Sequence, residues 1–480
     1  MNSMPLPDLL RVSPFKVRED QNVDTSILDP VVSTGANCRF VIPNKGILNS
    51  ETSKINLGLK CTGDVDGKHE VYVPLVNGVY SVVNRAILKV GTKIIGEIQD
   101  LNFWMSYYSA LLHPKVVRDK EQVLTGRGLS FGVNPYNEDL DVQGTNLNNG
   151  YTYQSFHATG MAVQQTDNND LHIPFYNNAI SSAVNVNKIL NYQLSLKELF
   201  PILADYNLPL YLMKEQLSIE LFYSANEDHL TMDEYENTNY DAKLSVDPDN
   251  VFLIVDYIYY PEEKMMEIAK YYTDNEFQDS RGNRRNGGRF NYVSQELVRS
   301  SIPDGASGQA FIRNVGGAGR VVHKIMCMNN TVITEADDKI GSILNSYIST
   351  APDNMSIQYN LIYNDLKCFP VNVSNPALVA KLIKEAEGIP IYLPVSNFSN
   401  MIIDSCAQKV SNRLITTMDG ERFYTCVSLA NNKRINQRGI LLQQNATFNG
   451  GTTPVNNRAW LEVEKVYSLD RNGIVEINYA

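Results

Sequence analysis

The sequence predicts an all-β protein built from two tandem units of similar plan, with a few short helices in the connections. Three observations lead to this prediction. Short runs of apolar and strand-forming residues recur along the chain with Asn, Gly and Ser between them, which is typical of β-sandwiches and barrels. A chain of 480 residues is long enough for two or three domains. Two segments of the first half also return, in the same order, in the second half.

The first repeated segment covers residues 80–109 and matches residues 319–348 without a gap. The displacement is 239 residues, about half of the chain, which is what a duplicated domain leaves behind. The matched positions are Val82 and Val83 with Val321 and Val322, Thr92 with Thr331, Ile94 with Ile333, and Tyr108 with Tyr347.

The second repeat pairs two helices, each followed by a short apolar segment. Residues 195–203 form the first predicted helix, before LPLYL at 208–212, and residues 375–388 form the second, before IPIYL at 389–393. Asn375 can cap the second helix, Pro376 suits its first turn and Gly388 its end. The spacing between the two repeats differs between the halves, so the units are predicted to share a core but not their loops.

Composition divides the chain into four parts. Residues 1–27 carry three prolines and mixed charges, which predicts an arm that is ordered only against a partner. Residues 28–272 form the first predicted unit and residues 290–480 the second. Between them, residues 273–289 are rich in Gly, Asn, Asp and Arg, which predicts a linker.

Within the units, the pattern predicts individual elements in order. Residues 217–223 and 475–479 alternate apolar and polar side chains, which predicts strands with one core face. Residues 251–260 are almost wholly apolar, which predicts a strand covered on both sides. Residues 101–113 form a predicted helix, and residues 126–150 a long polar loop with a functional or intermolecular role. Further predicted strands lie at 39–43, 54–59, 69–76, 79–90, 171–176 and 461–464.

The overall composition narrows the class of protein. Hydrophobic residues make up 43% and charged residues 20%, no run of eighteen apolar residues occurs, and the N-terminus lacks the apolar core of a signal peptide. We therefore expect a protein made in the cytosol or nucleus. A net charge of −11 argues against a protein that coats nucleic acid and suits one that stays soluble at high concentration.

Catalytic and metal-binding patterns are missing from the sequence. The cysteines form no C-x-x-C pair, which favours small buried side chains over a zinc site or disulfides. The histidines lack the spacing of a metal-dependent oxygenase, so we expect no metal, no cofactor and no enzyme activity. The residues concerned are Cys38, Cys61, Cys327, Cys368, Cys406 and Cys426, and His69, His113, His157, His172, His229 and His323.

Glycine-rich and acidic stretches are predicted to be turns. Gly126, Gly128 and Gly132 are spaced one residue too widely for a dinucleotide site, and the glycines at 316, 317 and 319 lack the Lys-Ser/Thr of a phosphate loop. Acidic segments at 64–67, 137–141 and 247–250 offer carboxylates to Ca²⁺, but none matches the twelve-residue calcium loop, and solvated turns are the preferred interpretation.

A basic cluster lies in the predicted linker and comprises Arg281, Arg284, Arg285 and Arg289. It could contact nucleic acid or an acidic neighbour. No aromatic residues alternate with the arginines to stack on bases, so a solvated, mobile linker is the preferred interpretation.

Four stretches give the chain a resemblance to a known family: GILNSETSKINLGL (46–59), PLYLMKEQLSIELFYSANED (209–228), VFLIVDYIYY (251–260) and AWLEVEKVYSL (459–469). With the β-rich halves and the absent catalytic pattern, the chain resembles the double jelly-roll major capsid proteins of icosahedral double-stranded DNA viruses, in particular those of polinton-like viruses and virophages. The resemblance implies two eight-stranded jelly-roll barrels in tandem and a homotrimer that forms a pseudo-hexagonal capsomer in the virion. It also implies neighbouring capsomers, minor capsid and penton proteins as partners, and an internal membrane reached by the N-terminal arm, without sequence-specific nucleic-acid binding.

Two other functions remain open at this point. A carbohydrate-binding β-sandwich of a viral fibre or surface would use tyrosine-rich loops to stack on sugars and acidic turns to hold Ca²⁺. An enzyme on a cupin-type barrel is disfavoured by the scattered histidines. A glycan array, calcium removal and metal analysis separate these functions from the capsid protein.

Overall fold

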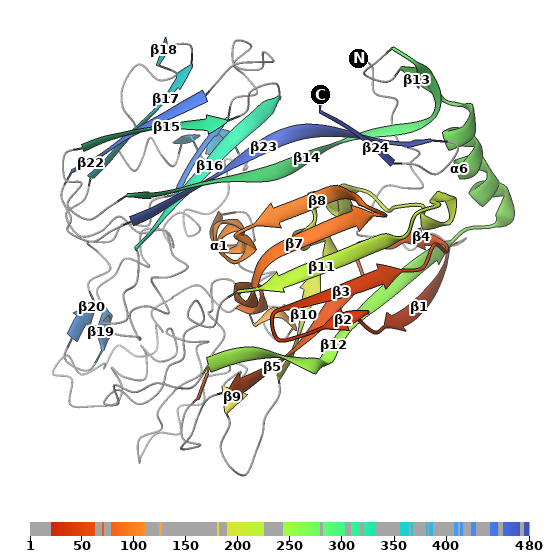
Figure 1. The fold of residues 1–480 in the computed structure, drawn as a ribbon, viewed down its shortest axis with the longest axis horizontal. Coiled ribbons are helices and arrows are strands. Elements are labelled where there is room, and N and C mark those ends of the chain that lie inside the picture. The colour runs from red at the N-terminus through yellow and green to blue at the C-terminus, as the bar shows by residue number, and fades with distance from the viewer. Residues whose placement is uncertain are drawn as a thin grey trace.

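The structure is a computed structural model that describes most of the predicted strands. It covers residues 21–62, 70–71, 78–111, 124–126, 180–181, 190–224, 243–278, 282–302, 309–316, 321–331, 356–363, 366–367, 381–382, 384–386, 408–410, 413–415, 424–428, 442–449, 455–470 and 475–479. Four main sheets dominate this part of the chain, two from each half (Figure 1).

The N-terminal half contributes two five-stranded sheets. Sheet 1 has the order β1 (Asn22–Leu28), β12 (Lys243–Tyr259), β5 (Lys54–Thr62) and β10 (Leu190–Ser195), with β4 (Ile47–Leu48) also paired to β12. Sheet 2 has the order β2 (Val32–Ser33), β3 (Asn37–Ile42), β11 (Leu217–Tyr223), β7 (Val83–Val90) and β8 (Lys93–Gln99). Every pairing in both sheets is antiparallel.

The C-terminal half repeats this arrangement. Sheet 3 has the order β13 (Glu276–Gln278), β14 (Arg284–Ile302), β23 (Val455–Asp470), β16 (Val322–Thr331) and β21 (Tyr424–Ser428), with β24 (Val475–Tyr479) paired to β23. Sheet 4 has the order β15 (Gln309–Gly316), β22 (Leu442–Asn449), β17 (Ser356–Tyr363) and β18 (Leu366–Lys367). Two small ladders pair β6 (Glu70–Val71) with β9 (Ile180–Ser181) and β19 (Gln408–Val410) with β20 (Arg413–Ile415).

The two halves share one strand order. Numbered along the chain, the principal strands of the first half are β1, β3, β5, β7, β8, β10, β11 and β12, and those of the second are β14, β15, β16, β17, β18, β21, β22 and β23. In each half, one sheet joins the first, eighth, third and sixth strands, and the other joins the second, seventh, fourth and fifth. This is the strand order of a jelly roll. The chain therefore has a double jelly-roll fold, as the sequence predicted.

Side-chain alternation explains the strands of the first jelly roll. In β3, Cys38, Phe40 and Ile42 are buried while Arg39 is exposed, because successive side chains point to opposite faces of a sheet. In β11, Leu217, Ile219 and Leu221 are buried in the core as predicted, but Ser218, predicted on the polar face, is buried as well. The apolar faces of sheets 1 and 2 meet in one continuous core.

The strand at 251–260 differs from the prediction that both its faces are covered. In β12, Val251, Leu253 and Val255 are buried, but Phe252 and Ile254 are only partly buried. The reason is that β12 lies inside a sheet of a two-layer sandwich, so a second layer covers one face only.

Short helices occupy the connections. They are α1 (Leu101–Leu111), α4 (Leu196–Leu199), α5 (Pro201–Asp205), α6 (Glu262–Asp274) and the 3-10 turns at Gly78–Val82 and Leu210–Leu212. The helix predicted at 101–113 is confirmed over its described residues, 101–111. The segment predicted as one helix at 195–203 forms two short helices, α4 and α5, with extended backbone at Phe200 between them. Of the helix predicted at 375–388, residues 381–382 and 384–386 are described and are helical.

The two halves repeat one fold, but the gapless sequence alignment pairs strands that are not equivalent in it. Residues 80–109 contain β7, the fourth strand of its jelly roll, whereas Val322 begins β16, the third strand of the other. The gapless sequence match was therefore wrong by one strand, because apolar strands of similar length match one another wherever they stand in the order.

The predicted arm and linker both contain regular structure. Residues 22–27 of the arm belong to β1, which pairs with β12. Residues 273–289 contain the end of α6, all of β13 and the start of β14, so most of the described residues of this stretch belong to a helix and a sheet rather than to a mobile linker. Gly288 allows close packing there, since a Cβ atom on it would lie 2.4 Å from Cε1 of Tyr272 on α6. The division at 28–272 and 290–480 otherwise remains a proposal.

Candidate functional site: the junction of the two jelly rolls

The best-defined site in the described part of the chain lies where the first jelly roll meets the second. β8 is the outer strand of sheet 2, and β14 of sheet 3 runs alongside it (Figure 1). In the ladder between β7 and β8, Leu88 pairs with Gly96 and Lys89 with Ile94, so Ile95 is the extra residue of a bulge. A bulge redirects the backbone groups of its extra residue away from the ladder.

Two tyrosines from the second jelly roll bind this bulge. The hydroxyl of Tyr292 on β14 donates to the carbonyl oxygen of Ile95 at 2.9 Å, and the hydroxyl of Tyr467 on β23 donates to the same oxygen. The centres of the two rings lie 4.7 Å apart. Both side chains are buried, so these hydrogen bonds form away from solvent.

A buried ion pair crosses the junction at the end of β8. Asp100 has a left-handed backbone with φ of 49°, which Asp tolerates better than most residues, and its carbonyl oxygen accepts from the backbone N–H groups of Phe103 and Trp104 in the first turn of α1. The Asp100 Oδ2 atom lies 2.9 Å from Nε of Arg458 on β23, and their side chains are 4% and 8% exposed. The Arg458 guanidinium also lies 3.6 Å from the centre of the Phe103 ring.

Both tryptophans of the protein belong to this junction. Trp460 on β23 donates its Nε1–H to the carbonyl oxygen of Gln99 at 3.3 Å. Its ring lies edge-on to that of Trp104 on α1, with ring centres 5.7 Å apart, and Trp104 in turn stacks on Tyr107. Since the chain has only two tryptophans, tryptophan fluorescence reports on this junction.

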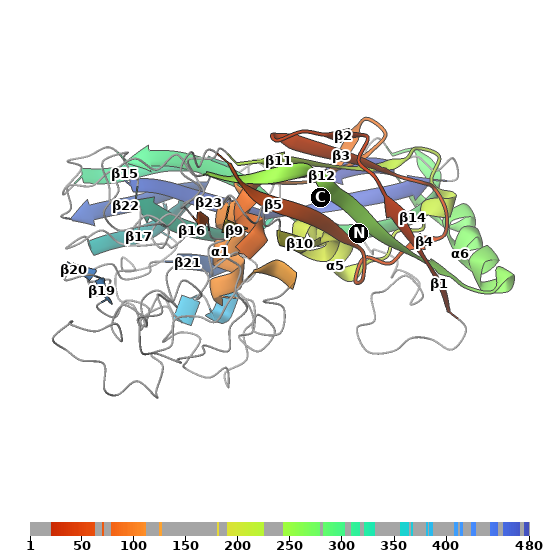
Figure 2. The same cartoon turned by 90° about the horizontal axis from the view of Figure 1, so that it is seen from below.

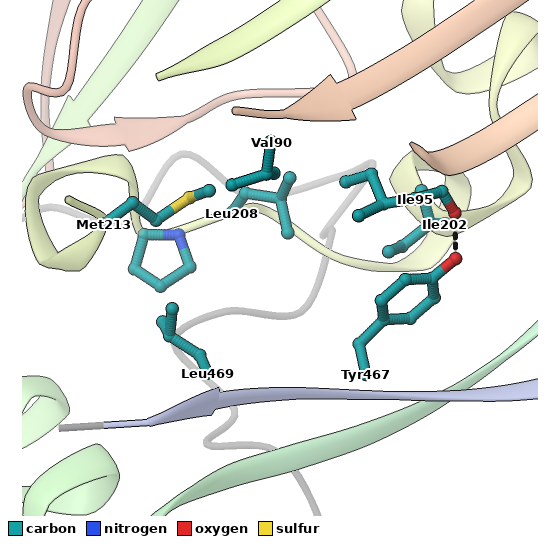
Figure 3. A pocket seen from close by; sticks show the side chains of 8 residues that line it. Val90, Ile95, Ile202, Leu208, Met213, Tyr467 and Leu469 are labelled. Atoms are coloured by element: carbon teal, nitrogen blue, oxygen red, sulfur yellow. Dashed lines mark hydrogen bonds between the residues drawn. The ribbon is translucent and has the colours of Figure 1, made fainter. Parts of the chain in front are cut away.

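A small apolar cavity lies beside the tyrosines (Figure 3). Its volume is about 20 Å³, and it is lined by Val90, Ile95, Ile202, Leu208, Pro209, Met213, Tyr467 and Leu469. The Tyr467 hydroxyl points to Ile95, so the lining offers no free polar group to orient a ligand. A binding pocket needs several hundred Å³ and convergent polar groups. The cavity is a packing gap between the two jelly rolls rather than a ligand site.

The chemistry of the junction suits a rigid connection. It combines an ion pair, tyrosine and tryptophan hydrogen bonds and stacked rings, all of which require a defined geometry. Separating the jelly rolls would break the Asp100–Arg458 ion pair and the tyrosine and tryptophan hydrogen bonds together, because all of them join the two halves. The two jelly rolls are therefore held in one relative orientation.

The acidic segment at 247–250 differs from the solvated turn that was predicted, because Asp247 is buried. It forms a bulge in β12 opposite β5, where the Asp247 carboxylate accepts from Lys60 at 2.9 Å and from Asn250. Burial alone would raise the pKa of Asp247, but these hydrogen bonds outweigh it and lower the pKa below its usual value. Its charge is already balanced by Lys60. The segments at 64–67 and 137–141 lie outside the described residues.

The other candidate residues from the sequence, where they are described, lie in the packed interior, in strands or in turns. Cys38 and Cys327 are buried and form no disulfide, as predicted, and burial raises the pKa of Cys38 to about 11. His323 Nε2 lies 3.3 Å from Glu464 on the neighbouring strand. Gly126 has φ of +72° and packs against Tyr192, consistent with a turn. The remaining five histidines lie outside the described residues.

Two kinds of site are missing from the described part of the chain. No group of three His, Cys, Asp or Glu side chains there could hold a metal ion. Among the helices that the structure describes, none is long and apolar enough to span a membrane.

The arginine cluster lies on the second jelly roll. Arg284, Arg285 and Arg289 belong to β14, whose first residues pair with β13, and the Arg289 guanidinium donates to the Gln278 carbonyl oxygen at 3.3 Å. Arg284 is exposed, and Arg281 lies outside the described residues. The preferred interpretation as a mobile linker was wrong for these three arginines.

Two comparisons of the sequence found no match. No protein family matches it. No curated protein matches it either.

Comparison with solved structures defines the class of fold. A structure of the Sputnik virophage matches with a TM-score of 0.57 and 10% identity over 100% of this chain and 93% of that one. The mavirus major capsid protein matches with a TM-score of 0.53 and 9% identity over 100% and 97%. The Faustovirus major capsid protein matches with a TM-score of 0.52 and 9% identity over 95% and 92%. The double jelly-roll fold is therefore shared, over nearly the full length of the chain, with viral major capsid proteins.

Proposed function

We propose that this protein is a major capsid protein, which forms the shell of an icosahedral double-stranded DNA virus. The observation that carries the proposal is the pair of jelly rolls with identical strand order, joined by a buried junction. Capsid proteins of Sputnik, mavirus and Faustovirus share this fold along almost the whole chain. The proposed location is the virion.

The proposed role of the protein is structural: it is a building block of the shell. Three chains carry six similar jelly rolls, which can fill a hexagonal outline while the contacts between chains obey threefold symmetry. Such a capsomer requires the two jelly rolls of each chain to keep a fixed orientation. The bonds of Tyr292 and Tyr467 to Ile95 and the Asp100–Arg458 ion pair support that requirement.

The proposed partners follow from this role. They are two further copies of the chain in a homotrimer, neighbouring capsomers, and minor capsid and penton proteins. The N-terminal arm is proposed to reach neighbours or an internal membrane. Neither an enzyme activity nor a cofactor belongs to the proposal.

Sedimentation of the purified protein tests the proposal. At low micromolar concentration we expect a single species with three times the mass of the 53.9 kDa chain, because obligate capsomers bury large interfaces. A stable monomer at that concentration would contradict the capsomer.

A further inference from the structure

One carboxylate in sheet 1 joins a lysine amine to an asparagine carboxamide. The Asp247 carboxylate on β12 accepts from Lys60 Nζ on β5 at 2.9 Å through Oδ1, and from Asn250 Nδ2 through Oδ2. An amine is a nucleophile when a neighbouring base takes its proton, and the carbonyl carbon of a carboxamide is a group that it can attack. The three side chains therefore carry the parts of a reaction that forms an amide between two strands.

A bulge in β12 places Asn250 beside these groups. In the ladder between β12 and β5, Asp247 pairs with Gly58 and the next pair is Val251 with Leu57, so residues 248–250 are extra residues of β12. Extra residues leave the ladder and point their side chains in new directions. In this bulge the Asn250 side chain turns back to Asp247, three positions before it.

Gly58 provides the space in which the Asn250 side chain lies. A Cβ atom on Gly58 would collide with Cβ of Asn250, so glycine at this position lets the side chain lie close to β5. Asn56 Nδ2 also donates to the Asn250 backbone carbonyl oxygen at 3.2 Å, which fixes the bulge against β5. Gly58 and Lys60 are two positions apart and therefore share one face of β5. The carboxamide is thus held on the face from which the Lys60 side chain extends.

The Asp247 carboxylate is better shielded from water than the Lys60 amine. Side-chain exposure is 7% for Asp247 and 32% for Lys60. Burial acts to raise the pKa of Asp247, but the hydrogen bonds from Lys60 and Asn250 lower it overall, so the ion pair is the resting state. The neutral amine that can attack a carbonyl carbon forms only when a proton crosses the 2.9 Å hydrogen bond to Asp247. The arrangement therefore suits a slow reaction that takes place once in the life of a chain.

We propose that Lys60 and Asn250 form an isopeptide bond that joins β5 to β12. A proton passes from Lys60 Nζ to Asp247, the freed electron pair of Nζ bonds to Cγ of Asn250, and the bond between Cγ and Nδ2 breaks with its electron pair going to Nδ2. Asp247 passes the two protons that Nζ loses to Nδ2, which leaves as ammonium, so the carboxylate ends ionised as it began. The product is a secondary amide, and the reaction balances without an oxidant or a reductant.

This bond is a covalent cross-link within the first jelly roll, and it goes beyond the proposed function without depending on it. It joins β5, the third strand of the jelly roll, to β12, the eighth. A cross-link between positions far apart in the sequence restricts the unfolded chain and so favours the folded one. The two strands then stay joined even when the hydrogen bonds between them break.

Mass spectrometry of the full chain tests the proposal. After the folded protein has been kept in buffer for days, its denatured mass is expected to lie below the sequence mass by one ammonia molecule. Digestion is expected to give a branched peptide in which Lys60 is bonded to Asn250. Lys60→Arg keeps the charge beside Asp247, but a guanidinium does not give up its proton, so this variant should keep its full mass. Asp247→Asn should form the bond at least about 100-fold more slowly, because the proton acceptor is lost.

Lys89→Arg is the matched control. Lys89 on β7 lies 2.5 Å from the Glu220 carboxylate on β11, and Arg39 lies 3.5 Å from the other oxygen of that carboxylate. This lysine thus faces a carboxylate that is paired with a guanidinium instead of a carboxamide. The variant should lose one ammonia molecule as the unaltered chain does, and circular dichroism checks that each variant is folded.

Two results would overturn the proposal. One is an unchanged mass of the unaltered chain after incubation. The other is a loss of ammonia that persists in Lys60→Arg, because an asparagine that closes on its own backbone also releases ammonia. If Lys60→Arg fails to fold, the digest of the unaltered chain decides: the branched peptide supports the proposal, and its absence contradicts it.

Discussion

Asp100 and Arg458 carry opposite charges at the centre of the junction, and more than nine-tenths of each side chain is buried. Attraction between buried charges repays their lost hydration only when geometry is good, so the pair adds little net stability, but losing one member is costly. The pair therefore fixes the relative orientation of the two jelly rolls more than it raises the free energy of unfolding. The Phe103 ring beneath the guanidinium adds to that constraint.

Replacing one member of this pair should therefore cost more than replacing both. Arg458→Met keeps most of the volume but takes the Arg458 charge away from the buried Asp100 carboxylate, which we expect to lower the free energy of unfolding by about 3 kcal/mol. Adding Asp100→Asn, which tolerates the left-handed backbone, should restore part of the loss. Urea unfolding followed by tryptophan fluorescence measures both, because Trp104 and Trp460 lie beside the pair.

The control for this prediction is Lys197→Met, which breaks the ion pair with Glu51 on the surface. Both side chains of that pair are about one-third exposed, so the change should stay within about 1 kcal/mol. A double variant as unstable as Arg458→Met alone would show that the buried charge is not the cause of the loss.

At the scale of elements, α6 links the last strand of the first jelly roll to the first strand of the second. It packs on β14 where Gly288 leaves room for Tyr272, whose side chain is buried. Tyr211 also donates its hydroxyl to the Met265 carbonyl oxygen at 2.8 Å, which holds the helix against the first jelly roll. α6 is thus a second fixed connection between the halves, on the side of the molecule away from α1 (Figure 2).

Substitution of Gly288 tests this connection. Gly288→Ala would place a methyl group 2.4 Å from the Tyr272 ring, and overpacking of this kind costs about 2 kcal/mol. We expect a lower Tm and faster amide hydrogen exchange in α6. Gly35→Ala is the control, because no atom lies within 4 Å of the added methyl group. Equal Tm values for the two variants would mean that α6 moves aside freely.

The sequence located individual strands and helices better than it predicted which strands pair with one another. Alternation located β11, β23 and β24, and helical patterns located α1 and α4, because these patterns reflect local geometry. The order in which the strands pair could not be predicted, because apolar strands such as β7 and β16 have similar sequences although they occupy different positions in their sheets. The glycines around 288 were interpreted as part of a linker because their structural role depends on packing. Gly288 lies in close contact with Tyr272 on α6, which the sequence alone does not show.

The junction was missed as a site, although two signals pointed to it. Both tryptophans are rare, large residues, and Asp100 stands directly before a predicted helix. Neither signal identifies a partner without the fold, because Asp100 and Arg458 are 358 residues apart. The bulge at Ile95 leaves no sequence signal of its own.

At the scale of the whole molecule, the described parts of the two jelly rolls are joined by buried contacts. Figure 2 shows β14 and β23 extending across both halves, so the strands themselves bridge the junction. A rigid pair of similar units in each chain is what a capsomer with six comparable sides requires. The central claim is therefore geometric, and images of the particle test it more directly than any variant.

Negative-stain imaging of the purified protein, with class averages viewed along the symmetry axis, is that measurement. The account predicts a closed particle of three chains with a near-hexagonal outline and six lobes, two from each chain. Single two-lobed particles, or rings in which the two lobes of a chain vary in relative orientation, would contradict it.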